Sequence, residues 1–185
     1  MTYRVTGLFE LEKSLNAMAK ATARAESRAV GRVATSIITA QSRAVVQRLN
    51  LKVSRVKEAV RIASKPTPEQ PRVIVEVKRR AVGLIEFGGQ WRGPKSAGAT
   101  VLVLKGGGRK TLDGAFIATG RGGNRQIFER KKKARLPIKA LYGPSVFSQF
   151  RREDIQEVGR KTWETRLPIE LQREIAFALK QAGLS

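Results

Sequence analysis

The stretch from Thr119 to Phe150, TGRGGNRQIFERKKKARLPIKALYGPSVFSQF, joins a basic glycine-rich loop to an apolar segment that closes on Tyr-Gly-Pro-Ser. Within it, Gln126-Ile127-Phe128 and the preceding Phe116-Ile117-Ala118 flank the loop at Gly120–Asn124, which predicts a pair of strands. Four consecutive cations follow at Arg130–Lys133. The stretch therefore predicts a packed sheet with an edge that faces a polyanion.

Further strands are expected before this stretch. Arg72–Lys78, RVIVEVK, alternates apolar and polar residues and predicts a half-buried strand with one apolar face, formed by Val73, Val75 and Val77. Ala81–Phe87 is a second short strand candidate. Residues 90–113 are rich in glycine and basic residues and predict an extended arm, a hairpin with its tip at Gly106–Arg109.

Helices are expected at both ends of the chain. Leu8–Leu49 has helical apolar spacing and lacks proline, which favours one long helix or two nearly collinear ones. Its alanine-rich middle fits either close approach of another helix or a solvated face. Ser54 to Val60 predicts a short helix, and Pro144–Trp163 and Pro168–Leu179 predict two more. The order helix, sheet, helix predicts an α+β fold.

The length and composition favour one domain over residues 1–185. Its expected parts are a helical part at 1–64, a sheet at 72–142 that includes the arm, and C-terminal helices at 144–185. The N-terminus lacks a signal-peptide core and no apolar run could span a bilayer, so we expect a soluble protein made in a cytoplasm, without a membrane partner.

The formal net charge of +22 indicates a polyanionic or acidic partner. Residues 81–150 carry 13 Lys and Arg against three Asp and Glu, whereas residues 151–185 carry seven against six. A solvated charge run is the usual meaning of such a cluster, but the local excess favours nucleic acid, and the scarcity of aromatic residues favours duplex backbone over single strands. The candidate DNA-proximal residues are Arg121, Arg125, Arg130, Lys131, Lys132, Lys133 and Arg135.

No enzymatic site is predicted. Cysteine and histidine are absent, which excludes thiol nucleophiles, Cys/His zinc sites and histidine acid-base chemistry. The segment Leu104–Thr111 departs from the phosphate-loop pattern because Arg109 stands where glycine is required before Lys110. The few carboxylates near the sheet show no defensible metal or acid-base spacing, and Glu86 is more simply one member of a structural ion pair. We therefore expect no catalytic residue, metal or cofactor.

Two segments, Ala81–Gly88 (AVGLIEFG) and Arg135–Val146 (RLPIKALYGPSV), resemble the minor tail protein Z family of lambda-like tailed bacteriophages, also called tail completion proteins. Similarity in kind extends over most of the chain, including a Gly-Arg-Gly-Gly loop before a hydrophobic-Phe-basic strand. The resemblance implies a non-enzymatic virion component in the neck, at the head-proximal end of the tail. It also implies an α+β neck-protein fold.

The resemblance further implies a homo-oligomeric ring, sixfold to match the tail, around double-stranded genome DNA. The ring would meet the tail tube, the tail terminator and the head-tail connector, help to position the DNA, and be assembled in the host cytoplasm. The long helix and the C-terminal helices would pack subunit against subunit. The candidate interface residues are Glu86, Phe87, Trp91, Leu136, Ile138 and Tyr142.

Two other functions remain open from the residues alone. A ribosomal-type RNA-binding protein would have the same charge and Gly-Lys-rich arms. A nuclease or other phosphoryl-transfer enzyme is opposed by the missing histidines and the sparse acidic residues.

Overall fold

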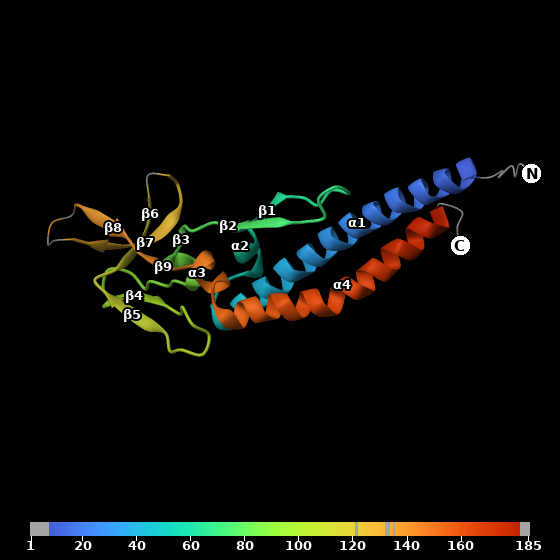
Figure 1. Ribbon diagram of the computed structural model, residues 1–185. Helices are drawn as coiled ribbons and strands as arrows, with labels where there is room; N and C mark the ends of the chain where they lie inside the picture. Colours follow the sequence, from blue (N-terminus) through green and yellow to red (C-terminus); the bar gives the residue numbers. More distant parts are fainter. Residues whose placement is uncertain (1–7, 121, 132–133, 135, 182–185) are drawn as a thin grey trace, which may run out of the picture. The chain divides into compact units, whose positions relative to one another are not determined.

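The computed structural model describes residues 8–120, 122–131, 134 and 136–181, and its architecture is α+β (Figure 1). A long helix comes first, small antiparallel sheets follow, and helices close the chain, which confirms the predicted fold class. The helices are α1 (Leu8–Arg48), α2 (Val53–Lys57), the 3-10 helix η1 (Leu84–Phe87), α3 (Val146–Phe150) and α4 (Glu153–Gln181). The strands are β1 (Val60–Ser64), β2 (Ile74–Val77), β3 (Ala81–Gly83), β4 (Gly98–Val101), β5 (Lys110–Asp113), β6 (Phe116–Thr119), β7 (Arg125–Arg130), β8 (Ile138–Ala140) and β9 (Tyr142–Ser145).

The chain forms two compact units that alternate along the sequence. Unit 1 comprises Met1–Ile38, Ile62–Glu76 and Gly159–Ser185, and unit 2 comprises Thr39–Arg61 and Val77–Val158. Helices α1 and α4 and the β1–β2 pair each contribute residues to both units. The assignment of residues 1–185 to one domain stays a prediction.

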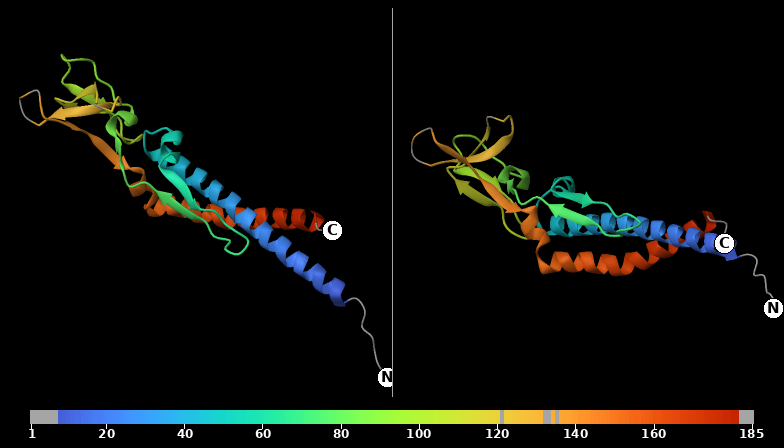
Figure 2. Two further views of the ribbon diagram at one scale, coloured as in Figure 1. Left: turned by 90° about the horizontal axis from the view of Figure 1, so that it is seen from above. Right: turned by 45° about the horizontal axis from the view of Figure 1, so that its top comes forward.

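In unit 1, the middle of α1 is buried. Small and β-branched side chains cover this helix where it is least exposed, namely Ala25, Ala29, Val30, Val33 and Ala34. Ala178 and Glu174 of α4 are buried as well, and Gly31 lies against Pro66 in the β1–β2 connection. The β1–β2 hairpin runs alongside α1 in all views (Figures 1 and 2). The alanine-rich face therefore serves close approach within the chain and is not a solvated face.

Unit 2 has a single hydrophobic cluster. Val45 of α1 and Leu49, the residue after this helix, are both almost fully buried, and the largest fully buried side chain among the described residues is Phe87 of η1. Val56, Ile127 and Val146 join them from α2, β7 and α3. A Cβ on Gly143 would lie 2.6 Å from the Phe87 ring, so the glycine of Tyr-Gly-Pro-Ser makes room for this core residue.

The sheet β6–β7–β8 has two different faces. Opposite residues of antiparallel strands point to the same side, so Ile117 and Ile127 share one face, and both belong to or pack on the core. The other face carries Phe116, Phe128 and Ala140, which lie opposite one another across the three strands. The predicted pairing of residues 116–118 with 126–128 is confirmed.

The predicted hairpin of the arm is confirmed as well, because β4 pairs with β5 and the three consecutive glycines lie between them. The arm contacts other parts of unit 2. Leu104 bridges to Leu49 at the end of α1, and the Arg109 guanidinium donates to the carbonyl of Gly88 at 2.8 Å. Gly88 itself has a φ of 66°, a left-handed conformation that glycine adopts without strain, which is where the E-F-G turn ends η1.

The C-terminal helices differ from the prediction. Pro144 lies in strand β9, and α3 begins only at Val146, where the side chain of Ser145 caps the helix by accepting from the Ser148 amide. Pro168 lies inside α4 and does not start a second helix. An internal proline costs about 3 kcal/mol, and burial of α4 residues such as Ala178 offsets that cost.

Two further boundaries and the expected burial of one residue were wrong. Residues 60–64 form strand β1, although we expected them to belong to a helical part, because they pair with β2. The expected strand at Ala81–Phe87 stops at Gly83 and continues as η1. Val75 of β2 is exposed, since a two-stranded sheet leaves much of each face uncovered.

Candidate basic surface and assembly interfaces

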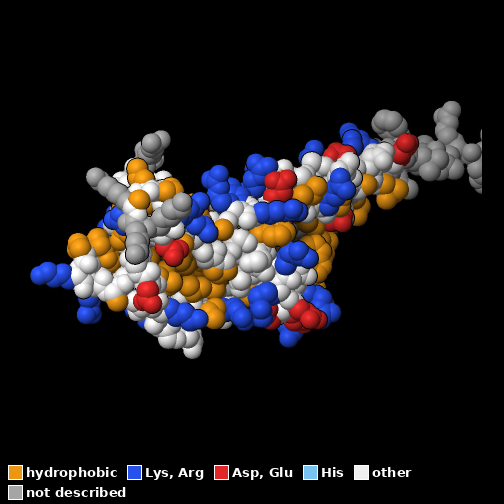
Figure 3. Space-filling view, turned by 90° about the vertical axis from the view of Figure 1, so that its left-hand side faces the viewer, with side chains coloured by type: hydrophobic (Ala, Val, Ile, Leu, Met, Phe, Trp, Pro, Cys, Tyr) orange, Lys and Arg blue, Asp and Glu red, His pale blue; other side chains and the backbone are white. Residues whose placement is uncertain are grey.

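Unit 2 holds most of the positive charge. It contains 24 Lys and Arg against seven Asp and Glu, a formal excess of +17, whereas unit 1 contains 13 against eight, an excess of +5. Lys and Arg side chains are spread over the face seen in Figure 3, where Asp and Glu side chains are fewer. The cation-rich segment expected from the sequence therefore lies mainly in unit 2, which contains strands β3 to β9.

Strand β7 separates the predicted DNA-proximal cations. Arg125 begins this strand and Arg130 ends it, about 17 Å away at 3.4 Å per residue. Their positions differ by an odd number, so their side chains leave opposite faces of the sheet. Arg125, Arg130 and Lys131 are all exposed, and the remaining four candidates, Arg121, Lys132, Lys133 and Arg135, lie outside the described residues.

Arg130 is held against an aromatic cluster. Its guanidinium carbon lies 5.2 Å from the centre of the Phe116 ring, and Phe116 contacts Trp91 and Phe128 with ring centres 6.3 and 6.2 Å apart. Trp91, Phe116 and Arg130 line an open hollow of about 260 Å³. Stacking on a ring orients a guanidinium while its N–H groups stay available to an anion. The end of β7 is thus suited to contact a phosphate or a carboxylate.

Three predicted interface residues lie around η1, and their surroundings differ. Glu86 forms an ion pair with Arg55 (3.9 Å), which agrees with the structural pair expected from the sequence. Trp91 is half-buried and packs on the core as well as on Phe116. Phe87 is fully buried, so its ring fills the core of unit 2 and not its surface. The expectation that Phe87 is an interface residue does not fit this burial.

The other three interface candidates are exposed apolar side chains on two sheets. Strand β8 is an edge strand of the β6–β7–β8 sheet, and Leu136 just before it and Ile138 within it are 68% and 36% exposed. Tyr142 lies in β9, which pairs with β3, and is 56% exposed. Exposed apolar side chains on an unpaired edge such as β8 are suited to cover or to extend the sheet in an assembly.

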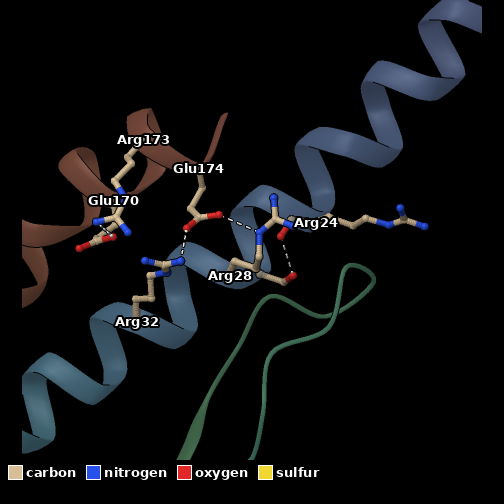
Figure 4. A network of polar contacts seen from close by, with 7 residues as sticks. Arg24, Arg28, Arg32, Glu170, Arg173 and Glu174 are labelled. Atoms are coloured by element: carbon tan, nitrogen blue, oxygen red, sulfur yellow. Dashed lines mark hydrogen bonds and ion pairs between the residues drawn. The ribbon is translucent and has the colours of Figure 1, made fainter. Parts of the chain in front are cut away.

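Two further arrangements were not predicted. In unit 1, Glu174 is buried and forms ion pairs with Arg28 (2.7 Å) and Arg32 (2.9 Å), as Figure 4 shows. In unit 2, Arg79 and Arg151 both lie over the ring of Phe147. The sequence did not predict these contacts, because Glu174 is far from Arg28 and Arg32 in the chain, as Phe147 is from Arg79.

A third pair lies at the start of α4. Arg152 donates from Nε and Nη2 to the two carboxylate oxygens of Asp154, at 3.0 and 3.3 Å. These hydrogen bonds hold the pKa of the Asp154 carboxyl below its ordinary value, although partial desolvation acts in the opposite direction. Arg152 is thereby neutralised locally, in contrast to the neighbouring Arg151.

Over the part of the chain that the structure describes, His, Cys, Asp and Glu side chains form no group of three or more that could hold a metal ion. Within that same part, no helix combines the length and the apolar character needed to cross a bilayer.

The family model described as prophage minor tail protein Z (GPZ) matches residues 5–182, which confirms the resemblance noted in the sequence. Among curated proteins and solved structures, none matches the chain significantly.

Proposed function

We propose a place in the virion for this chain, which belongs to the prophage minor tail protein Z family. A structural role in a phage tail follows from the family. Within the tail, the chain completes the head-proximal end as one subunit of a homo-oligomeric neck ring, sixfold like the tail, that surrounds the genome DNA. It meets the tail tube, the tail terminator and the head-tail connector, and it helps to position the DNA and to join tail to head.

The observation that carries this proposal is the uneven distribution of charge. Copies of a protein with a formal charge of +22 repel one another, so a ring of them needs an anion at the positive surface and a nearly neutral surface between subunits. Unit 2, with its excess of +17, offers the positive surface, and unit 1, with +5, is closer to the nearly neutral surface. Duplex DNA, with one charge per about 1.7 Å, is the anion that best matches such an excess.

Subunit contacts are assigned to apolar surfaces. On unit 2 the apolar residues are Leu136, Ile138 and Tyr142, and the half-buried Trp91 and the charged Glu86 of η1 complete the proposed interface. On unit 1 the long helices carry exposed apolar side chains, among them Leu15, Met18, Ile169 and Phe177. Family membership favours this role over the ribosomal-type alternative, which no separate observation supports.

The test neutralises the basic run in the intact phage. A variant with Arg130, Lys131, Lys132 and Lys133 all changed to Gln is expected to assemble tails but to lose most infectivity, because DNA is no longer held at the neck. Its charge-matched control changes four cations of unit 1 to Gln, namely Lys13, Lys20, Lys65 and Arg72, and is expected to retain infectivity.

Full infectivity of the first variant would sink the assignment of this surface to the DNA channel. An image of the intact neck, at a resolution that separates subunits, then tests the ring itself. Density for this chain at the tail tip, or in a single copy, would contradict the proposed position.

A further inference from the structure

Two arginines from distant parts of unit 2 meet on one phenylalanine ring. The guanidinium carbon of Arg79 lies 5.0 Å from the centre of the Phe147 ring, and that of Arg151 lies 5.8 Å from it. Strand pairing explains the meeting, since β3 and β9 are antiparallel with Ala81 opposite Ser145. Arg79 stands two residues before Ala81 and Phe147 two residues after Ser145, so both leave the same end of the strand pair.

Among the described residues, neither guanidinium forms an ion pair with a carboxylate. The carboxylates that do form ion pairs contact other cations, among them Arg28, Arg32, Arg55, Arg152 and Arg173. The neighbouring Arg152 is different, because Asp154 neutralises it. Two like charges at one ring repel each other, and the exposed Lys78 and Arg80 add to the local excess. An anion bound between the guanidiniums would relieve that repulsion.

We propose that Arg79, Arg151 and Phe147 form a second phosphate-binding site for duplex DNA, separate from the cations around β7. The proposal rests on the proposed function, in which DNA passes this protein. Phe147 fixes the planes of both guanidiniums, and their N–H edges bind phosphate oxygens in pairs. Because the arginines cover the ring, it is not available to stack on an unpaired base, so the site holds backbone and reads no sequence.

The experiment measures how the full-length protein binds a short DNA duplex as salt is raised, by fluorescence anisotropy. Each phosphate contact contributes about 0.9 to the slope of log K against log salt. The double variant Arg79→Gln, Arg151→Gln is expected to lower that slope by about 1.8. The charge-matched control Lys65→Gln, Arg72→Gln, in the exposed β1–β2 connection, is expected to leave the slope unchanged.

A third variant, Phe147→Leu, keeps both charges and removes the ring. We expect its affinity for the duplex to fall about fivefold, as the guanidiniums lose their common orientation. Thermal melting verifies that each variant is folded. Affinity equal to that of the unchanged protein would show that the ring does not order the site, and would overturn the proposal.

The outcomes separate this site from the proposed function. If the unchanged protein fails to bind duplex DNA, both proposals fail. If Arg125→Gln, Arg130→Gln lowers the slope and Arg79→Gln, Arg151→Gln does not, only the second site is wrong. An unchanged DNA slope with weaker binding to polyglutamate would assign the pair to an acidic protein and would also overturn it.

Discussion

Arginines that lie over aromatic rings have opposite surroundings in the two units. In unit 1, Arg28 lies over the Phe177 ring and also donates to the buried Glu174, so its charge is matched inside the chain. In unit 2, Arg79, Arg130 and Arg151 lie over rings too, but no described carboxylate pairs with them. A ring-stacked arginine is therefore charge-matched inside the chain in unit 1, whereas in unit 2 its charge faces solvent.

Burial explains the difference. Glu174 is 4% exposed, and an ionised carboxylate in that position is costly unless cations compensate it. Two arginines of α1 do so where α4 packs on that helix. The arginines of unit 2 that lie over aromatic rings are exposed, so water solvates their charge and no carboxylate of the chain is needed to compensate it. Their charge remains available to an external anion.

The largest expected effect concerns the backbone of unit 2. Gly98→Ala places a Cβ on top of the carbonyl oxygen of Leu112, within the β4–β5 pair. We expect a loss of about 3 kcal/mol or more in the free energy of unfolding, because backbone and not a flexible side chain must move. Urea denaturation measures it. The control is Gly106→Ala, whose added Cβ would have no neighbour within 4 Å. Equal stabilities of the two variants would show that the contact between Gly98 and Leu112 does not limit stability.

The next effect concerns the neutralised arginines of unit 1. Glu174→Ala leaves Arg28 and Arg32 without their shared partner, and we expect the free energy of unfolding to fall by about 2 kcal/mol. The value is below that of a fully buried pair because both arginines are partly solvated. Glu164→Ala, an exposed site on the same helix, should change stability by less than about 0.5 kcal/mol. Similar losses of unfolding free energy in both variants would show that the ion pairs of Glu174 do not stabilise the fold.

A smaller effect compares one matched and one unmatched arginine directly. Arg130→Gln should lower the salt slope of duplex DNA binding by about 0.9, since one phosphate contact is lost. Arg28→Gln removes the same charge but one already paired with Glu174, so the slope should not change. Anisotropy titrations of the two variants test this. Equal slope changes would erase the distinction between the units.

The smallest effect is local to the start of α4. Arg152→Gln should raise the pKa of the Asp154 carboxyl towards its ordinary value, because the hydrogen bonds from Arg152 are the main cause of the lowered pKa. Since the folded pKa is the lower one, this pair favours the folded state above the ordinary pKa, and that contribution is lost as the pH falls through the folded pKa. Carboxyl chemical shifts followed by NMR report the change. An unaltered titration would mean that another group sets the pKa.

Local signals predicted much of the fold correctly. The helical spacing of Leu8–Leu49 and the paired strands around Gly120–Asn124 depend on neighbours within a few residues, so the sequence contains their cause. Local signals failed at Pro168, where packing of α4 outweighs an unfavourable residue, and at residues 60–64, where pairing with β2 overrides helix propensity.

The order of two short motifs was enough to indicate the family, and composition alone leads to the prediction of an anionic partner, because neither inference depends on which residues meet in space. Which cations are neutralised was decided by the tertiary structure. Arg28 meets a carboxylate 146 positions away, and Arg79 meets a ring 68 positions away through the register of β3 and β9. Charge is a property of each residue, whereas pairing is a property of contacts between distant segments, so folding alone determined where the unpaired charge lies.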